Sequence, residues 1–129
     1  LDLFAATKED TKIIINPKKA EMIPTGIAIS VPSGYEAQIR PRSGLAAKNG
    51  ITVLNSPGTI DSDYRGEILV MLINHSNKDF EILRGMRIAQ MVISKIEQFN
   101  LISVDELDTT DRGKDGFGST GISIKKDEE

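Results

Sequence analysis

The apolar residues of this chain occur in short stretches separated by turn sequences, and this spacing constrains the fold more than any other feature. The stretches are rich in β-branched residues and only a few residues long, which is typical of strands. They lie at 12–15, 26–31, 35–39, 51–54, 68–73, 80–83, 87–96 and 101–104. Clusters of Asn, Pro, Ser and Gly separate them, at intervals typical of an antiparallel sandwich. We therefore predict an all-β fold, a distorted jelly roll or β-sandwich.

Two segments depart from this pattern. Residues 43–50 begin with Ser43, contain two alanines and end with Gly50, which predicts one short helix with Ser43 as its N-cap. From residue 108 onward, 22 residues contain ten charged residues and four glycines. Such a segment cannot fold on its own, so it either stays disordered or packs on another subunit or a ligand. We therefore divide the chain into a β jelly-roll body, 1–107, and an extended C-terminal arm, 108–129.

Composition excludes several classes of protein. The chain has 129 residues, 39% hydrophobic and 27% charged, which fits one globular domain. A formal charge of −3 provides no basic field, so we expect no stable nucleic-acid binding. The longest apolar run, 68–73, is far shorter than the roughly 18 residues of a membrane helix, so we expect no membrane partner. The absence of cysteine excludes disulfides and thiolate chemistry and suits a reducing, cytoplasmic location.

Catalysis must rely on few residue types. His75 is the only histidine and lies in a turn sequence, so we interpret it as a structural or solvated turn residue. One chain therefore cannot form a three-His zinc site, and a Ser–His–Asp triad would need that same histidine. Carboxylates, hydroxyls, arginines and glycines remain, and these suit phosphates and oxygen-binding cations.

The glycine-rich segment 112–121 contains a G-x-G-x-x-G pattern, but no strand precedes it and no βαβ unit follows. It also resembles a P-loop, except that Ser119 replaces the lysine. The first interpretation fails on its context and the second on the missing lysine. Backbone N–H groups and hydroxyls of such a run can still bind phosphate oxygens, and Phe117 could stack on a base. The alternative is a flexible tail with an incidental Phe117.

Two further polar clusters are candidate sites. The turn at 55–58, between 51–54 and 59–60, predicts a hairpin, and an extended strand after it puts Asp61 and Asp63 on one face. One carboxylate could then raise the pKa of the other toward that of a general base. Asx turns and an ion pair with Arg65 are the alternatives.

The second cluster consists of Arg40 and Arg42, which share a strand face and lead into the helix at Ser43. This arrangement predicts an anion site. A capped helix with solvated arginines explains the same residues.

Taken together, five segments in order resemble the motifs of the homotrimeric dUTP diphosphatase (dUTPase) family: 1–3, 41–46, 58–66, 84–90 and 112–121. The resemblance implies a jelly-roll homotrimer with three sites, each built from three chains, and a C-terminal arm that closes over a neighbour's site. It implies hydrolysis of dUTP to dUMP and pyrophosphate by Mg²⁺-assisted in-line attack of water on the α-phosphorus. That reaction limits uracil incorporation into DNA and supplies dUMP for dTTP synthesis.

The resemblance also assigns roles to individual residues. Asp61 is the catalytic base, and Tyr64 lies against the deoxyribose, where it rejects ribonucleotides. Asp2 and Gln90 contact Mg²⁺ through water, with Gln90 also at the substrate. Uracil is held at the hairpin and covered by Phe117. The base contacts are Asn55, Gly58, Thr59 and Ile60, and the phosphate contacts are Arg42, Ser43, Gly44, Arg112, Gly118, Ser119 and Thr120.

Two other functions are weighed on the same scaffold. In dCTP deaminases, a catalytic glutamate lies in the strand after the third motif, where this chain has Met71. A thioether cannot relay protons, so deamination is disfavoured. A non-catalytic dUTP-binding or signalling protein could lose the base, and the presence of Asp61 weighs against it.

Overall fold

The computed structural model describes residues 1–123, in two compact units: Leu1–Gln98 and a second that begins at Phe99. The first unit contains nine strands and one short helix. These elements are β1 (Asp2–Phe4), β2 (Lys12–Ile15), β3 (Ala20–Pro24), β4 (Tyr35–Arg40), α1 (Ser43–Asn49), β5 (Ile51–Val53), β6 (Gly58–Ile60), β7 (Leu69–Asn74), β8 (Phe80–Leu83) and β9 (Arg87–Lys95). The all-β prediction with one short helix is confirmed. Residues 124–129 of the predicted arm lie outside the described residues.

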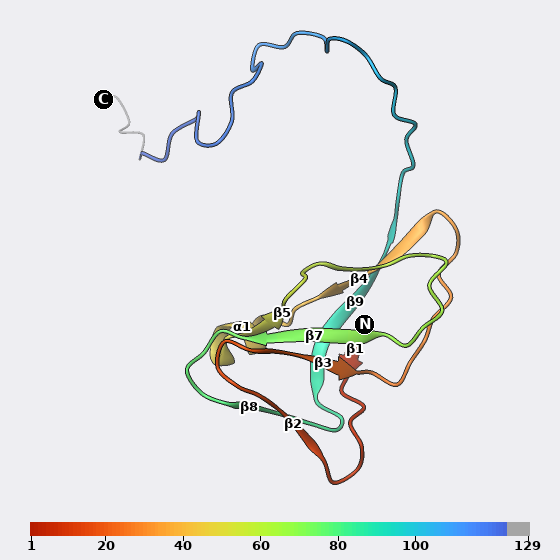
Figure 1. The fold of residues 1–129 in the computed structure, drawn as a ribbon, viewed down its shortest axis with the longest axis vertical. Coiled ribbons are helices and arrows are strands. Elements are labelled where there is room, and N and C mark those ends of the chain that lie inside the picture. Colours follow the sequence, from red (N-terminus) through yellow and green to blue (C-terminus); the bar gives the residue numbers. More distant parts are fainter. Residues whose placement is uncertain (124–129) are drawn as a thin grey trace. The chain divides into compact units, whose positions relative to one another are not determined.

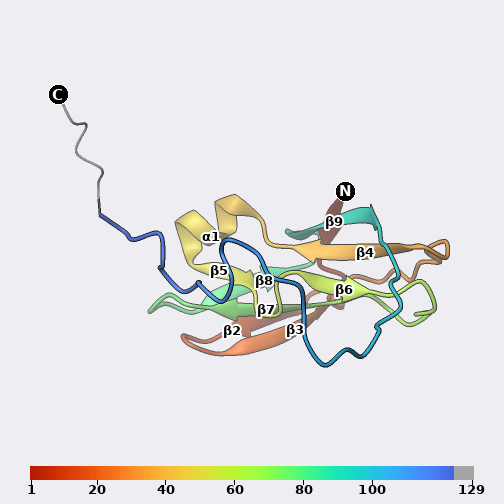
Figure 2. The same cartoon turned by 90° about the horizontal axis from the view of Figure 1, so that it is seen from above.

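The strands form three antiparallel sheets, ordered β1-β9-β4-β6, β3-β7-β5 and β2-β8. Figure 1 shows β3, β7 and β5 running across the body, with the β2–β8 pair below them. In Figure 2, the sheet that contains β4, β9 and β6 forms the upper layer of the picture, and the strands of the other two sheets form the lower layer. This arrangement is a two-layer sandwich.

The core lies between these layers because strand residues alternate between two faces. In β7, Val70, Leu72 and Asn74 are buried, whereas Leu69 is exposed. Full burial of one such aliphatic side chain contributes roughly 1.5–3 kcal/mol. The largest fully buried apolar side chains are Leu3, Ile15, Ile23, Ile51, Ile68, Val70, Leu72, Ile82 and Ile88.

Asn74 is the one polar residue among the largest fully buried side chains of the described chain. Its amide nitrogen donates to the carbonyls of Ile15 (2.8 Å) and Lys78 (2.7 Å). Its oxygen accepts from the Ser76 N–H at 2.9 Å. The network ties the end of β7 to β2 and to the loop before β8. His75 follows it as an exposed residue, as expected for a turn.

Two predicted strands are wrong, and two observed strands, β1 and β3, were not predicted. The predicted strand 26–31 is wrong, because Gly26 has a left-handed φ of +70° and no ladder follows. The predicted strand 101–104 is also wrong, since residues 99–123 contain neither helix nor strand. β3 was missed because Glu21 and Met22 are exposed and Pro24 ends it. Within residues 1–123, no helix is long and apolar enough to cross a membrane.

Candidate active site

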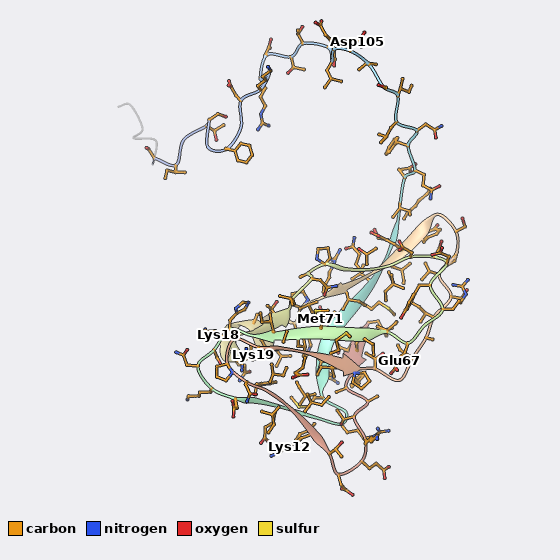
Figure 3. All side chains as sticks on the ribbon, in the orientation of Figure 1. Lys12, Lys18, Lys19, Glu67, Met71 and Asp105 are labelled. Atoms are coloured by element: carbon orange, nitrogen blue, oxygen red, sulfur yellow. The ribbon has the colours of Figure 1, made fainter. Side chains whose placement is uncertain are left out.

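A pocket is lined by β6, the loop that follows it and the first half of β7. Its volume is about 190 Å³. Six residues that the sequence analysis assigned to catalysis or substrate line it: Asn55, Gly58, Thr59, Ile60, Asp61 and Tyr64. Buried side chains of β4, β5 and β7 form part of the wall, with Glu67 and Met71 beside them. Figure 3 shows Glu67 just before β7 and Met71 midway along it.

The loop after β6 begins with a tight turn, in which the N–H of Tyr64 donates to the Asp61 carbonyl at 3.1 Å. The expectation that Asp61 and Asp63 share a face of an extended strand is therefore wrong, because β6 has already ended. The Arg65 guanidinium donates to the carbonyls of Ser62 (2.7 Å) and Tyr64 (2.9 Å). Arg65 thus stabilises the turn through the backbone and not through an aspartate.

Tyr64 folds back over its own loop. Its hydroxyl donates to the Glu67 carbonyl at 2.8 Å. A Cβ added at Gly66 would lie only 2.4 Å from the Tyr64 oxygen and 2.7 Å from its Cζ. The Tyr64 ring therefore occupies the space that a side chain at position 66 would need, and only glycine leaves that space open.

The predicted hairpin at 51–60 is also wrong. β5 pairs with β7, whereas β6 pairs with β4, so residues 54–57 cross between two sheets. Gly58 lies opposite Ile39, and an added Cβ would approach Ile39 Cβ to 3.1 Å. The same Cβ would lie 3.6 Å from the Asn55 amide nitrogen. The crossing is therefore closely packed against β4 at this wall of the pocket.

The crossing also leaves part of β7 facing the pocket. The Leu54 N–H donates to the Met71 carbonyl at 2.9 Å, and after this bond the chain leaves the edge of β7. Leu69, Val70 and Met71 line the pocket at this point. An exposed strand edge offers backbone donors and acceptors, which can read the edge of a planar base.

A second polar group lies at the β1 edge of the four-stranded sheet. Asp2 is opposite Gln90, which is opposite Arg40, and directly opposite residues point to the same face. The Gln90 amide donates to Asp2 Oδ1 at 3.4 Å. Asp2 forms ion pairs with Arg42 Nε at 3.9 Å and Arg87 Nε at 3.5 Å. The structure thus brings together Asp2, Gln90 and Arg42, as the predicted metal and phosphate contacts require.

Arg87 is a member of this group that sequence reasoning missed. Its guanidinium also lies 5.8 Å from the centre of the Phe4 ring, and its carbonyl accepts from Arg42 at 3.3 Å. Arg87 therefore contacts both Asp2 and Arg42. Arg87 lies in the motif segment 84–90, but its contacts come from the pairing of β1 with β9, a long-range feature that no local pattern contains.

Arg42, Ser43 and Gly44 lie together at the start of α1. The prediction of Ser43 as N-cap is wrong: Arg42 is the N-cap, with an extended backbone, and no side chain caps the helix. Arg40 ends β4 and Arg42 lies beyond it, so the two arginines do not share a strand face. The predicted end of the helix at Gly50 is confirmed, because Gly50 has a left-handed φ of 65°.

The second unit carries the remaining predicted residues in a series of tight turns. The Arg112 guanidinium donates to the Asp115 carbonyl at 2.8 Å, and the Ser119 N–H donates to the Gly116 carbonyl at 3.1 Å. Phe117 lies in the second turn with a left-handed φ of 48° and is fully exposed. Arg112, Phe117, Gly118, Ser119 and Thr120 are therefore close in the chain and exposed to solvent.

Comparison with known proteins identifies the family. A family model described as dUTPase matches residues 1–121. The chain belongs to the dUTPase family. It is 56% identical to the deoxyuridine 5′-triphosphate nucleotidohydrolase of Rhizobium rhizogenes over 122 residues, which cover 95% of this chain and 78% of the relative. The enzyme of that name from Orientia tsutsugamushi is 58% identical over 122 residues, with 95% and 81% coverage.

Solved dUTPase structures have the same fold. A variant of the dUTPase of Staphylococcus bacteriophage 80alpha with dUpNHpp aligns with a TM-score of 0.82 and 26% identity, over 94% of this chain and 85% of that chain. The dUTPase of Streptococcus mutans aligns with a TM-score of 0.70 and 25% identity, with 77% and 79% coverage. The predicted distorted jelly roll is confirmed, as is the resemblance to dUTPases on which the residue assignments rest.

Proposed function

We propose that the protein hydrolyses dUTP to dUMP and pyrophosphate. The observation that carries this proposal is the pocket, in which Asp61 and Tyr64 lie beside the backbone of 55–60. The relatives at 56% and 58% identity, named deoxyuridine 5′-triphosphate nucleotidohydrolase, support it. So does the phage dUTPase with dUpNHpp, a dUTP analogue, which covers 94% of this chain.

In this proposal the base and the sugar occupy the pocket. Uracil binds at the crossing 55–60, where backbone groups and Asn55 read its edge. The tight crossing leaves no room for the 5-methyl group of thymine in this proposal, so dTTP is rejected by a clash. Tyr64 lies against the deoxyribose and excludes a 2′-hydroxyl.

Asp61 is the general base of the proposed reaction. Its carboxylate accepts a proton from a water molecule as the water oxygen bonds to the α-phosphorus. The bond from the α-phosphorus to the bridging oxygen breaks in line, and pyrophosphate leaves with the electron pair. Positioning and charge stabilisation supply most of the catalysis in phosphoryl transfer, so the side chains around the phosphates matter as much as the base.

The donor set fits Mg²⁺ held mainly by substrate. Within residues 1–123, no group of three or more His, Cys, Asp or Glu side chains could hold a metal ion by itself. Asp2 and Gln90 offer adjacent oxygen atoms, and Asp2 is already engaged with two arginines, which suits contact through water. Mg²⁺ usually keeps several waters and binds through phosphates and one or two carboxylates. When bound, it neutralises charge on the triphosphate.

The phosphates are held from two directions in this proposal. Arg42, Ser43 and Gly44 bind the phosphate chain from the start of α1. The arm, 108–129, closes as a lid over the site of a neighbouring chain, with Phe117 over the uracil bound there. Its remaining contacts bind the γ-phosphate end: Arg112, Gly118, Ser119 and Thr120.

A homotrimer with sites shared between chains accounts for two observations. The pocket of one chain is lined by none of the Asp2 group: Asp2, Arg42, Arg87 and Gln90. In addition, the segment that begins the second unit exposes large apolar side chains: Phe99 82%, Leu101 98%, Ile102 83% and Leu107 83%. Such side chains gain stability when another surface covers them.

Mixed trimers test this sharing. Asp61→Asn and Arg42→Ala each inactivate a different part of the site. If the two parts come from different chains, co-refolding equal amounts of the two inactive variants restores about a quarter of the sites. Mixtures with no more activity than the separate variants would place both parts in one chain.

The reaction itself is tested by product analysis with Mg²⁺ and, separately, dUTP, dCTP, dTTP and UTP. We expect conversion of dUTP alone, to dUMP and pyrophosphate. A deaminated product from dCTP would indicate a deaminase, which the Met71 thioether in the pocket disfavours. Tight dUTP binding without turnover would indicate a binding protein on the same scaffold.

A further inference from the structure

A single carboxylate ties the loop after β6 to another segment of the body. Oε1 of Glu67 accepts a hydrogen bond from the N–H of Gly26 at 2.8 Å, across 41 positions in the chain. Glu67 is exposed and lines the pocket together with Asp61 and Tyr64. The Glu67 side chain therefore lies at the pocket, but its hydrogen bond is to the segment after β3, outside the pocket. None of the roles assigned above uses this carboxylate.

The donor of this bond is held rigidly. Gly26 has a left-handed φ of +70°, and an added Cβ would lie 3.1 Å from Ala6 Cβ, so its backbone is packed as well as turned. Two neighbouring bonds fix the same segment: Ile68 N–H donates to Ile27 carbonyl at 2.8 Å, and Thr25 Oγ1 donates to Ile68 carbonyl at 2.6 Å. Gly26 is thus a fixed anchor point beside the start of β7.

Glu67 also contacts Tyr64 through its backbone. The Glu67 carbonyl accepts from the Tyr64 hydroxyl at 2.8 Å, while the carboxylate of the same residue holds Gly26. Residue 67 therefore connects the tyrosine to the fixed segment. If the carboxylate bond to Gly26 were lost, the Glu67 carbonyl that accepts from Tyr64 would be held on one side only. The remaining anchor would be the bond from the Ile68 N–H to the Ile27 carbonyl.

We propose that Glu67 is a positioning residue for Tyr64, and that its bond to Gly26 sets the selectivity of the site for deoxyribose over ribose. This inference rests on the proposed function, because the sugar contact of Tyr64 does. A bond to an ionised acceptor is stronger than a neutral one, so an exposed glutamate is suited to hold a loop in water. The effect acts on the sugar contact and only weakly on the chemical step.

The test compares Glu67→Ala and Glu67→Gln with the unmodified protein, using dUTP and UTP as substrates. Glu67→Ala removes the acceptor, so we expect KM for dUTP to rise about two- to twelvefold, the range of one lost hydrogen bond. The preference for dUTP over UTP falls by a similar factor, and kcat changes less than twofold. Glu67→Gln keeps an acceptor oxygen at the same length, so it retains most of the preference.

A matched control is Glu81→Ala, which removes another exposed carboxylate, on the β2–β8 sheet away from the pocket, where its one partner is Lys12. We expect it to leave KM and selectivity unchanged. A Glu67→Ala variant that melts at a lower temperature but keeps the KM and selectivity of the unmodified protein would show that Glu67 is structural only. Loss of selectivity in Glu67→Gln equal to that in Glu67→Ala would also overturn the inference, because the glutamine keeps an acceptor for the Gly26 N–H and that bond would then not decide the selectivity. If the unmodified protein does not hydrolyse dUTP, the proposed function itself fails.

Discussion

Gly66→Ala tests how the loop after β6 places Tyr64. The new Cβ would lie 2.4 Å from the Tyr64 oxygen, 2.7 Å from Cζ and 3.1 Å from Cε2. An aromatic ring cannot bend away from such contacts, so the whole side chain must rotate out and break its bond to the Glu67 carbonyl. Loss of a neutral hydrogen bond costs about 0.5–1.5 kcal/mol, or about two- to twelvefold in affinity. Removing a glycine from the unfolded chain stabilises by about 0.4–1 kcal/mol, which offsets much of the effect on folding.

We therefore expect Gly66→Ala to raise KM for dUTP and lower selectivity against UTP, while the melting temperature changes little. Steady-state kinetics with both substrates and thermal unfolding measure these quantities. The control is the same substitution in a Tyr64→Ala background, where no ring remains to displace and the alanine should have no further kinetic effect. Equal effects in both backgrounds, or no change in KM, would refute the reasoning.

Two substitutions and one truncation test the remaining parts of the structure. Asp61→Asn should lower kcat by on the order of 10² to 10⁴ with binding of a non-hydrolysable dUTP analogue retained, and comparable turnover would remove Asp61 from the mechanism. Truncation after Asp111 should abolish efficient hydrolysis but leave the circular dichroism of the body intact; a melted body would instead show that the arm is structural. Asn74→Ala should destabilise the protein by about 2–4 kcal/mol in urea unfolding, because it removes the amide donor from the buried Ile15 carbonyl and one of the two donors to the Lys78 carbonyl, and a loss under about 1 kcal/mol would contradict that network.

Local sequence predicted the strands whose own side chains favour an extended backbone. The apolar run 68–73 becomes β7, and the stretch 80–83 becomes β8, because short β-branched segments with alternating burial favour strands. β3 is different: Met22 is exposed, and the segment is a strand because it pairs with β7, as in Met22 opposite Met71. The strand propensities of residues 20–24 alone do not predict this pairing with β7.

The same distinction applies to the site. Asn55, Gly58, Asp61 and Tyr64 lie within ten positions of one another, so a local motif was sufficient to assign them to one pocket. Their backbone geometry was mispredicted, because the partner strands of β5 and β6 belong to different sheets. Long-range pairing decides such geometry, and a turn signal read from one segment cannot anticipate it.

The sheet order gives a physical reason for the proposal that the site is shared between chains. β6, which carries the pocket, and β1, which carries Asp2, are the two edges of the same four-stranded sheet. Three strand spacings separate them, about 14 Å in all. In the proposed reaction, a water activated by Asp61 attacks next to that residue, and direct hydrogen bonds reach only about 3 Å. Asp2 of the same chain lies on the opposite edge of the sheet and does not line the pocket, so in the proposed trimer the Asp2 that reaches the phosphates is supplied by a neighbouring copy.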